Sequence, residues 1–311
     1  MPTPHDLPPS PGPGRTPGAL PVSVWLVGQQ PSRLQRRDRY LPASIAHPAK
    51  MLPALAAHAI TAYTEPGDLV LDPMCGIGTT LVEATHAGRD AIGIEYEPRW
   101  GILATRNLRH ATNHGATGHG TVLFGDARHL AATLHPHLSG RVALLLTSPP
   151  YGRSVHGLVK GNPGHGVTKW DHTYSRDKTN LAHQPTATLL AGFTAILRDC
   201  QPLLKPGGIL VITARPWRRG GLLIDFPTAA LAAATRAGYE PVQRCVALLA
   251  AVRDSDLIPH SSFFQVQHVR TARTQGRPIH LIQHEDVLIL RRPPEPPANV
   301  ITLPVAERRA A

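Results

Sequence analysis

The sequence has few cysteines, and they are scattered. Cys75, Cys200 and Cys245 lie far apart and form no Cys-x-x-Cys pair. Three widely spaced cysteines without such a pair argue against a structural zinc site and against a disulfide framework. We therefore expect no metal site and a protein that works in a reducing compartment.

Long apolar runs are also missing. No stretch approaches the roughly 18 residues that a transmembrane helix needs. The N-terminus has neither a charged segment followed by an apolar one nor the cleavage site of a secretory signal. These absences predict a soluble, unsecreted, cytoplasmic protein.

Acidic residues are outnumbered by basic ones. The 311 residues include 32 Lys and Arg against 21 Asp and Glu, a net charge of +11. Such an excess suits a polyanionic partner such as nucleic acid. A compositional bias toward Arg, Ala and Pro explains the charge equally well, so charge alone leaves both explanations open. The apolar content of 42% is enough for the core of one large domain.

Both ends of the chain are poor in large apolar side chains. Residues 1–21 hold a dense mixture of Pro, Gly and Ser, which buries too little surface to offset the entropy lost on ordering. We expect a disordered tail there and a frayed, Pro-rich tail over 292–311. The predicted folded domain is 22–291.

Strand and helix patterns alternate within this domain. A short edge strand is expected at 22–27. The main strands are expected at 68–71, 91–94, 122–124, 142–146, 209–213, 242–252 and 285–290. Helical patterns lie between most of them, one of which starts near Pro48. The alternation predicts a doubly wound α/β sheet of seven strands whose last two strands form an antiparallel hairpin.

A glycine-containing loop joins the first main strand to a helix. It reads Asp72-Pro73-Met74-Cys75-Gly76-Ile77-Gly78-Thr79-Thr80. In a strand, loop and helix of this kind, backbone N–H groups and the helix N-terminus can approach a ligand closely. A Gly-x-Gly pattern is weak by itself, but the residues that follow strengthen it.

Carboxylates also end the next two strands. Glu95 follows Asp72 by 23 residues, a spacing at which an acidic side chain can accept both hydroxyls of a ribose. Asp126 ends the third strand and suits an adenine amino group. A solvated Glu95 that caps the following helix is the alternative. Acidic residues at three successive strand ends favour a ligand site.

The fourth main strand ends in Ser148-Pro149-Pro150-Tyr151. Two consecutive prolines cannot extend a strand, so this is a rigid turn at the edge where open α/β sheets bind ligands. The turn suits a planar substrate with an exocyclic amine, which is a poor nucleophile because its lone pair is conjugated. Ser148 Oγ and the Pro149 carbonyl can accept hydrogen bonds from the N–H groups and draw the lone pair out of conjugation. Tyr151 can stack on a base that has left its helix.

Two polar insertions lie beside the expected site. Residues 152–184 interleave basic with aromatic side chains and suit a nucleic acid clamp, and residues 253–284 add further arginines. A flexible surface insertion is the alternative for the first. The weaker candidates for nucleic acid contact are Arg153, Lys160, Lys169, Trp170, Arg176, Arg215, Arg218 and Arg219.

Together these pieces resemble the S-adenosylmethionine-dependent amino-methyltransferases, above all the DNA methyltransferases that modify cytosine N4 or adenine N6. The matching segments are 47–51, the loop from Asp72, Glu95, Asp126, the turn at Ser148 and Lys205-Pro206-Gly207-Gly208. The resemblance implies a Rossmann-like methyltransferase sheet with a catalytic turn, Ser148, Pro149, Pro150 and Tyr151. It implies S-adenosylmethionine binding by Pro48, Ala49, Lys50, Met51, Asp72, Pro73, Met74, Cys75, Gly76, Gly78, Thr79, Glu95, Tyr96, Asp126 and Ala127.

Serine at the first turn position is associated in this family mostly with cytosine N4. The resemblance therefore implies site-specific DNA methylation, with any restriction nuclease as a separate chain. An RNA methyltransferase acting on guanine N2 or adenine N6 is the runner-up, because such enzymes have closely related turns. Methylation at carbon 5 of cytosine requires a cysteine nucleophile, which the turn lacks. A nucleic-acid-binding module on a degenerate fold is the non-enzyme alternative, and the intact motifs disfavour it.

Overall fold

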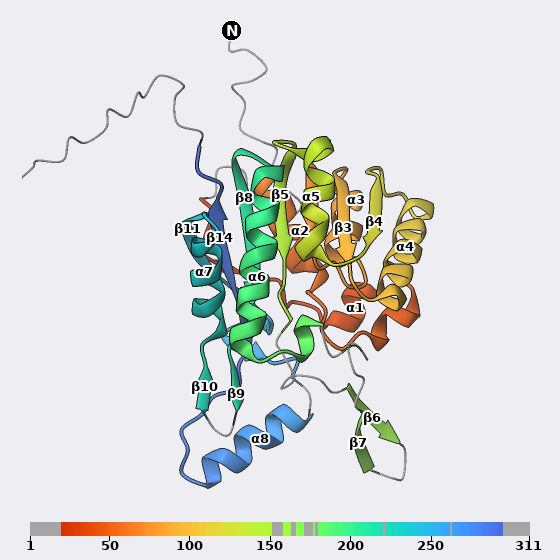
Figure 1. Cartoon of the computed structure of the whole chain (residues 1–311). Coiled ribbons are helices and arrows are strands. Elements are labelled where there is room, and N and C mark those ends of the chain that lie inside the picture. The colour runs from red at the N-terminus through yellow and green to blue at the C-terminus, as the bar shows by residue number, and fades with distance from the viewer. Residues whose placement is uncertain are drawn as a thin grey trace, which may run out of the picture.

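The computed structural model describes residues 20–150, 158–162, 166–170, 177, 180–219, 222–261 and 263–294. They form a mixed α/β domain around one large sheet (Figure 1). In spatial order its strands are β1 (Val24–Trp25), β11 (Glu240–Leu248), β14 (His284–Arg291), β8 (Leu204–Ala214), β5 (Val142–Thr147), β2 (Leu69–Asp72), β3 (Asp90–Glu95) and β4 (Gly120–Phe124).

Neighbouring strands of this sheet are parallel except at β14, which runs antiparallel to both β11 and β8. The predicted fold class, a doubly wound sheet with a reversed final hairpin, is thereby confirmed. The expected edge segment adds an eighth strand, because Val24 and Trp25 pair with β11. All side chains of β5 are buried, as its unbroken apolar sequence predicts.

Helices cover both faces of the sheet (Figure 1). One face packs against α5 (Ala127–Leu138), α6 (Thr186–Cys200) and α7 (Phe226–Arg236), and the other against α2 (Pro53–Tyr63), α3 (Thr79–His86) and α4 (Pro98–Asn113). The remaining short helices are α1 (Ser32–Arg36), η1 (Pro42–Ala46), η3 (Leu181–His183) and η4 (Gln201–Leu203). None of the described helices is long and apolar enough to cross a lipid bilayer.

One helix starts later than the sequence predicts. The pattern predicted a helix from Pro48, but α2 begins at Pro53, whose missing N–H costs nothing in a first turn. Residues 47–51 are therefore an irregular segment. Because these residues are not helical, they can line the edge of the sheet.

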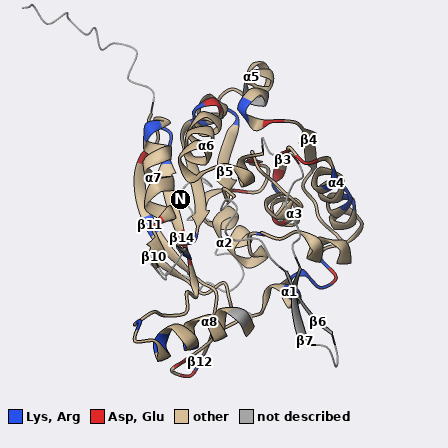
Figure 2. Ribbon diagram, turned by 60° about the horizontal axis from the view of Figure 1, so that its bottom comes forward, with Lys and Arg blue, Asp and Glu red and all other residues tan. Residues whose placement is uncertain are grey.

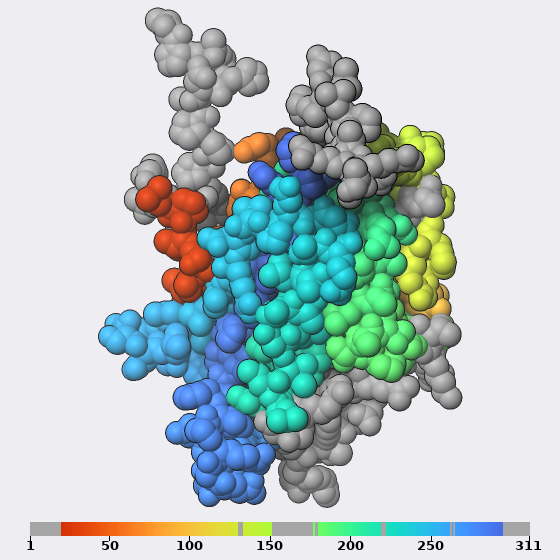
Figure 3. Space-filling view, turned by 60° about the vertical axis from the view of Figure 1, so that its left-hand side comes forward, coloured from red at the N-terminus to blue at the C-terminus, as the bar shows by residue number. Residues whose placement is uncertain are grey.

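Both insertions contain regular structure, where the sequence predicted loops. The first includes an antiparallel hairpin, β6 (Leu158–Asn162) and β7 (Gly166–Trp170). The second includes β13 (Asp256–Ile258) and the helix α8 (Phe263–Thr274). The predicted strand 242–252 is divided, because β11 ends at Leu248 and a separate strand, β12 (Ala251–Arg253), pairs with β13. A further hairpin, β9 (Trp217–Arg219) and β10 (Leu222–Ile224), follows β8. The β6–β7 hairpin, the β9–β10 hairpin and α8 lie beyond the same edge of the sheet, and Figure 3 shows the second insertion projecting from the body.

A buried carboxylate fixes the N-terminal segment to α3. Glu83, only 3% exposed, accepts hydrogen bonds from Arg39 Nε at 2.9 Å and from Tyr40 Oη at 2.6 Å. Burial, together with the Glu83 charge, raises the pKa of Tyr40 well above its usual value, so the phenol stays a donor. The nearby Arg36 guanidinium is buried and donates to the Met51 carbonyl at 2.6 Å. Two arginines of the N-terminal segment, Arg36 and Arg39, thus stabilise the fold.

Glu83→Ala should lower the free energy of unfolding by about 3 kcal/mol, because it leaves Arg39 and Tyr40 without their acceptor. The matched control is Glu240→Ala, whose partner Arg291 lies 2.8 Å away in an exposed pair and which should cost less than about 1 kcal/mol. Urea unfolding measures both. Equal losses would contradict the structural role of Glu83.

Candidate active site

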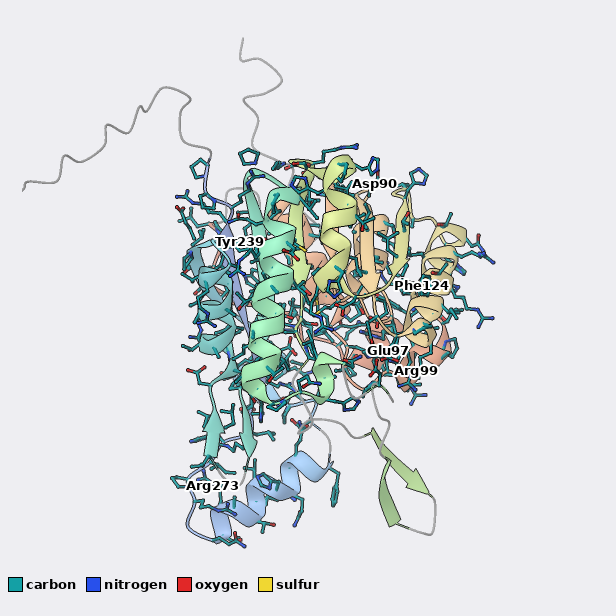
Figure 4. All side chains as sticks on the ribbon, viewed as in Figure 1. Asp90, Glu97, Arg99, Phe124, Tyr239 and Arg273 are labelled. Carbon is teal, nitrogen blue, oxygen red and sulfur yellow. The ribbon has the colours of Figure 1, made fainter. Side chains whose placement is uncertain are left out.

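The carboxyl ends of the parallel strands border a cavity of about 250 Å³. Figure 4 locates this edge, since the label Asp90 marks the start of β3 and the label Glu97 lies just beyond its carboxyl end, and Figure 2 looks onto it, with acidic residues near the ends of β3 and β4. Most predicted site residues line the cavity: Pro48, Ala49, Lys50, Met51, Asp72, Pro73, Met74, Cys75, Gly76, Thr79, Glu95, Tyr96, Asp126, Ala127, Ser148, Pro149, Pro150 and Arg215.

Asp72 connects the glycine loop to the strand that carries the turn. Its carboxylate accepts hydrogen bonds from the Met74 N–H at 3.1 Å, from Thr80 Oγ1 at 2.6 Å and from Thr147 Oγ1 at 3.1 Å. Burial raises the pKa of Asp72 to about 6, although the three hydrogen bonds work against the increase. Because Thr147 immediately precedes Ser148, Asp72 also fixes where the turn begins.

Glu95 closes the glycine loop from the neighbouring strand. One carboxylate oxygen accepts the Gly76 N–H and the other accepts the Glu97 N–H, both at 2.8 Å. Burial raises its pKa to about 7, and these backbone donors limit the rise. A carboxylate has about four lone-pair sites, so Glu95 keeps acceptor capacity toward the cavity. A solvated Glu95 is excluded, since it is buried.

Asp126 has a partner that sequence reasoning missed. It caps α5 by accepting the Arg128 N–H at 2.9 Å, and the Arg128 guanidinium donates to both carboxylate oxygens. Burial works to raise the pKa of Asp126, but the bonds from Arg128 outweigh it and the pKa is lowered. The third strand end therefore presents an ion pair to the cavity.

The segment 47–51 forms the opposite wall. His47 is buried, and its ring packs edge-on against Trp100 with centroids 4.6 Å apart. Burial and the nearby Lys50 keep the pKa of His47 well below its usual value, so the imidazole is neutral. Burial and Arg36 lower the pKa of Lys50 to about 8, and its ammonium donates to the carbonyls of Ile45 and His47. Burial raises the pKa of the Cys75 thiol, which argues against a nucleophilic role.

The turn itself faces the same cavity from β5. Pro149 is buried, and Ser148 and Pro150 are half-buried. Tyr151 lies outside the described residues. The carbonyls and the hydroxyl of the turn thus share one cavity with Glu95 and the glycine loop.

Some predicted site residues lie elsewhere. Gly78 does not line the cavity but starts α3 with a φ of +80°, and Arg218 does not line it either. Arg153 and Arg176 lie outside the described residues, as do the side chains of Lys160, Lys169, Trp170 and Arg219. Lining residues that sequence reasoning missed are Thr80, Gly125, Arg128, Asn180, Leu181, Ile196 and Glu285. His47 and Ile77 line the cavity as well and lie within the matching segment 47–51 and the loop from Asp72. Within the described part of the chain, no group of His, Cys, Asp and Glu side chains is arranged to hold a metal ion.

The strand order and the position of the cavity define an α/β protein with a cavity at the carboxyl edge of a Rossmann-like sheet, where open α/β sheets place their ligands. Residues 16–101 match the model of a family described as DNA methylase. The resemblance to the amino-methyltransferases that the motifs carry is therefore confirmed.

Two relatives represent the sequence matches. A tRNA (guanine(10)-N2)-dimethyltransferase of Methanothermobacter thermautotrophicus is 34% identical over 110 residues, which cover 35% of this chain and 30% of the relative. The DNA adenine methyltransferase YhdJ of Escherichia coli is 39% identical over 81 residues, which cover 26% of this chain and 28% of the relative. The matched stretch thus spans less than a third of the length of either relative.

Solved structures resemble the chain more distantly. A SAM-dependent methyltransferase of Methanosarcina mazei has a TM-score of 0.45 at 13% identity and covers 76% of this chain and 98% of its own. A geranyl diphosphate methyltransferase in complex with SAM also has a TM-score of 0.45 at 13% identity and covers 78% of this chain and 85% of its own.

Gly76→Ala tests how closely the loop approaches segment 47–51. Gly76 has a φ of +54°, and a Cβ there would lie 3.0 Å from His47 Nε2. Gly67→Ala is the matched control, because Gly67 has a φ of +87° and open space around it. We expect the control to lose about 1 kcal/mol of stability from backbone strain and Gly76→Ala to lose at least about 2 kcal/mol in urea unfolding. Losses of the same size would show that His47 moves away freely.

Proposed function

We propose that this chain transfers a methyl group from S-adenosylmethionine to the exocyclic amine of a base in nucleic acid. The observation that carries the proposal is one cavity that joins the Ser148-Pro149-Pro150 turn to the glycine loop, Glu95 and Asp126. The match to the DNA methylase family supports it. The two relatives above, one named for guanine N2 in tRNA and the other for adenine in DNA, support it as well.

The polar groups around the cavity fit S-adenosylmethionine. Glu95 has acceptor sites for two ribose hydroxyls, and the segment from Gly125 to Arg128 offers carboxylate and guanidinium groups to an adenine edge. Lys50 lies where it can attract the methionine carboxylate, and the surrounding acidic groups suit a sulfonium cation. When bound, this cofactor supplies an electrophilic methyl group.

The turn prepares the amine that receives the methyl group. Ser148 Oγ and the Pro149 carbonyl accept hydrogen bonds from the amine N–H groups, which draws the nitrogen lone pair out of conjugation with the ring. The Asp72–Thr147 hydrogen bond holds the turn in register with the cofactor loop. The remaining contribution of the protein is alignment of nitrogen and methyl for in-line displacement.

Three bases are candidates for the methyl acceptor. Serine at position 148 favours cytosine N4 in DNA, as the sequence predicts. The relative named as a DNA adenine methyltransferase supports adenine N6. The relative named for guanine N2 in tRNA supports guanine, and so do the opposite charges of Arg215 and Glu285 in the cavity wall. Any of these bases must leave its stack to reach a recessed turn.

Elements around the cavity offer surface for the rest of the nucleic acid. The β6–β7 hairpin and α8 stand beyond the edge that carries the site, and Arg273 on α8 is exposed (Figure 4). Their placement supports insertions 152–184 and 253–284 as nucleic-acid-binding parts of a methyltransferase domain over 22–291. The segments 1–21 and 292–311 stand outside that proposed domain.

Ser148→Ala should reduce methyl transfer roughly 10²-fold, by analogy with removing one preorganised hydrogen-bonding group from an active site, while cofactor affinity stays nearly unchanged. Each protein is expressed in a host that lacks base methylation, and DNA and RNA are digested separately to nucleosides for mass spectrometry. Calorimetry with S-adenosylmethionine reports binding. Ser139→Ala, at the exposed end of α5, is the control and should remain active. Full activity of Ser148→Ala would refute amine activation by this hydroxyl.

Cofactor binding should weaken as the pH falls from 8 to 6, because Glu95 must be ionised to accept both hydroxyls and its pKa is about 7. The expected loss is about tenfold per unit below that pKa. Glu95→Gln should bind more weakly at pH 8 and lose this dependence. Lys50, with a pKa of about 8, gains charge over the same interval in both proteins, so the ratio of their affinities isolates Glu95.

The contribution of Glu95 to folding stability changes with pH in the opposite direction from its contribution to cofactor binding. Because the pKa of Glu95 is raised in the folded state, its protonation stabilises the fold at low pH, and this contribution is lost as the pH rises through about 7. With respect to Glu95, the free protein is therefore more stable at pH 6 than at pH 8. Calorimetric titrations at pH 6 and pH 8 measure cofactor binding. If the ratio of the affinities of the wild-type chain and Glu95→Gln is the same at both pH values, ribose recognition by Glu95 is contradicted.

A further inference from the structure

Two oppositely charged side chains enter the cavity from the half of the sheet beyond the turn. Arg215 directly follows β8, and Glu285 is the second residue of β14. The register pairs Asp286 with Ala214, which places Glu285 beside Arg215 on adjacent strands. Both side chains line the cavity that also contains Ser148.

Both side chains are half-buried, and their hydrogen-bonding groups are not all paired within the described part of the protein. Arg215 Nε is buried and has no hydrogen-bond partner there. Among the described residues, none donates a hydrogen bond to the Glu285 carboxylate, and no ion pair joins it to Arg215. Burial raises the pKa of Glu285, and the charge of Arg215 works against the increase. Unsatisfied polar groups of this kind are costly in a fold and are typical of a site that pairs with a ligand.

A second cavity meets the first at this position. It measures about 390 Å³, and its lining shares Lys50, Arg215 and Glu285 with the first cavity. Its other walls are rich in polar side chains, among them Gln30, Arg33, His260, Gln265 and Gln283. The volume falls within the range of about 300–1,000 Å³ that is usual for small-molecule sites. The turn lies between this second cavity and the cofactor loop, since β5 separates β8 from β2.

We propose that Arg215 and Glu285 recognise the edge of the target base, and that this base is guanine. The inference rests on the proposed function and narrows it to the N2 amine of guanine as methyl acceptor. Beside that amine, guanine presents a ring N–H donor and a carbonyl acceptor, which match a carboxylate and a guanidinium. Cytosine presents only acceptors beside its amine, and adenine presents one ring acceptor. Either would leave the Glu285 carboxylate without a donor.

Binding of mononucleotides tests the pair separately from catalysis. With sinefungin as a non-reactive cofactor analogue, calorimetry compares guanosine, inosine, adenosine and cytidine 5′-monophosphates. Inosine keeps the ring N–H and the carbonyl but has no amine. We expect guanosine and inosine monophosphates to bind at least about tenfold more tightly than the other two, because the Glu285 carboxylate disfavours a base edge that cannot donate a hydrogen bond to it.

Glu285→Gln should remove this preference and leave sinefungin binding intact, which also shows that the variant folds. Arg215→Lys, which loses the forked guanidinium, should weaken the binding of guanosine and inosine monophosphates to the same extent. Glu240→Gln carries the same change in an exposed ion pair on β11 and should keep the preference. Equal affinities for the four nucleotides, or an unchanged preference in Glu285→Gln, would overturn the proposal that Arg215 and Glu285 recognise guanine.

Nucleoside analysis of DNA and RNA from the expression host completes the test. N2-methylguanine with the wild-type chain, lost in Glu285→Gln and retained in Glu240→Gln, supports the pair. Methylated cytosine or adenine in place of guanine overturns it and leaves the proposed function intact. If the wild-type chain forms no methylated base, the proposed function fails, while the mononucleotide preference still decides whether Arg215 and Glu285 recognise guanine.

Discussion

The buried carboxylate of Asp72 is the contact on which the rest of the site depends. It receives one donor from the glycine loop, one from α3 and one from β5. Removing a carboxylate from water is costly, and these three hydrogen bonds offset that cost only while loop, helix and strand keep their relative positions. A single side chain thus sets the distance between the loop that faces one ligand and the turn that faces another.

The reversed strand β14 determines what the far half of the sheet can offer. In a parallel sheet, the carboxyl edge receives residues that follow each strand. Because β14 runs antiparallel to its neighbours, that edge receives the start of β14 instead, and Glu285 arrives beside Arg215. The turn at the end of β5 divides the edge into a half with a carboxylate at the end of each of β2, β3 and β4 and a half with the opposite charges of Arg215 and Glu285.

Local sequence patterns predicted the strands, the glycine loop, the buried turn and the positions of Asp72 and Glu95, because each depends on a few consecutive residues. Contacts between distant segments were not predictable. The bonds from Arg39 and Tyr40 to Glu83 join residues more than forty positions apart, and Glu285 acquires its neighbour only through strand pairing. The start of α2 was misplaced because Pro48 and Pro53 both suit a first helical turn. The helix α8 was missed because its surface is mostly exposed and lacks a clear apolar period.

The segment between Gln30 and Leu52 contributes walls to both cavities, and Glu83 holds it to α3. Any displacement of this segment by a ligand in one cavity would therefore also change the wall of the other cavity, although the two ligands need not touch each other. Linkage requires any such coupling to be reciprocal. The irregular stretch around Lys50, which borders both cavities, is thus the structural element through which such coupling would act.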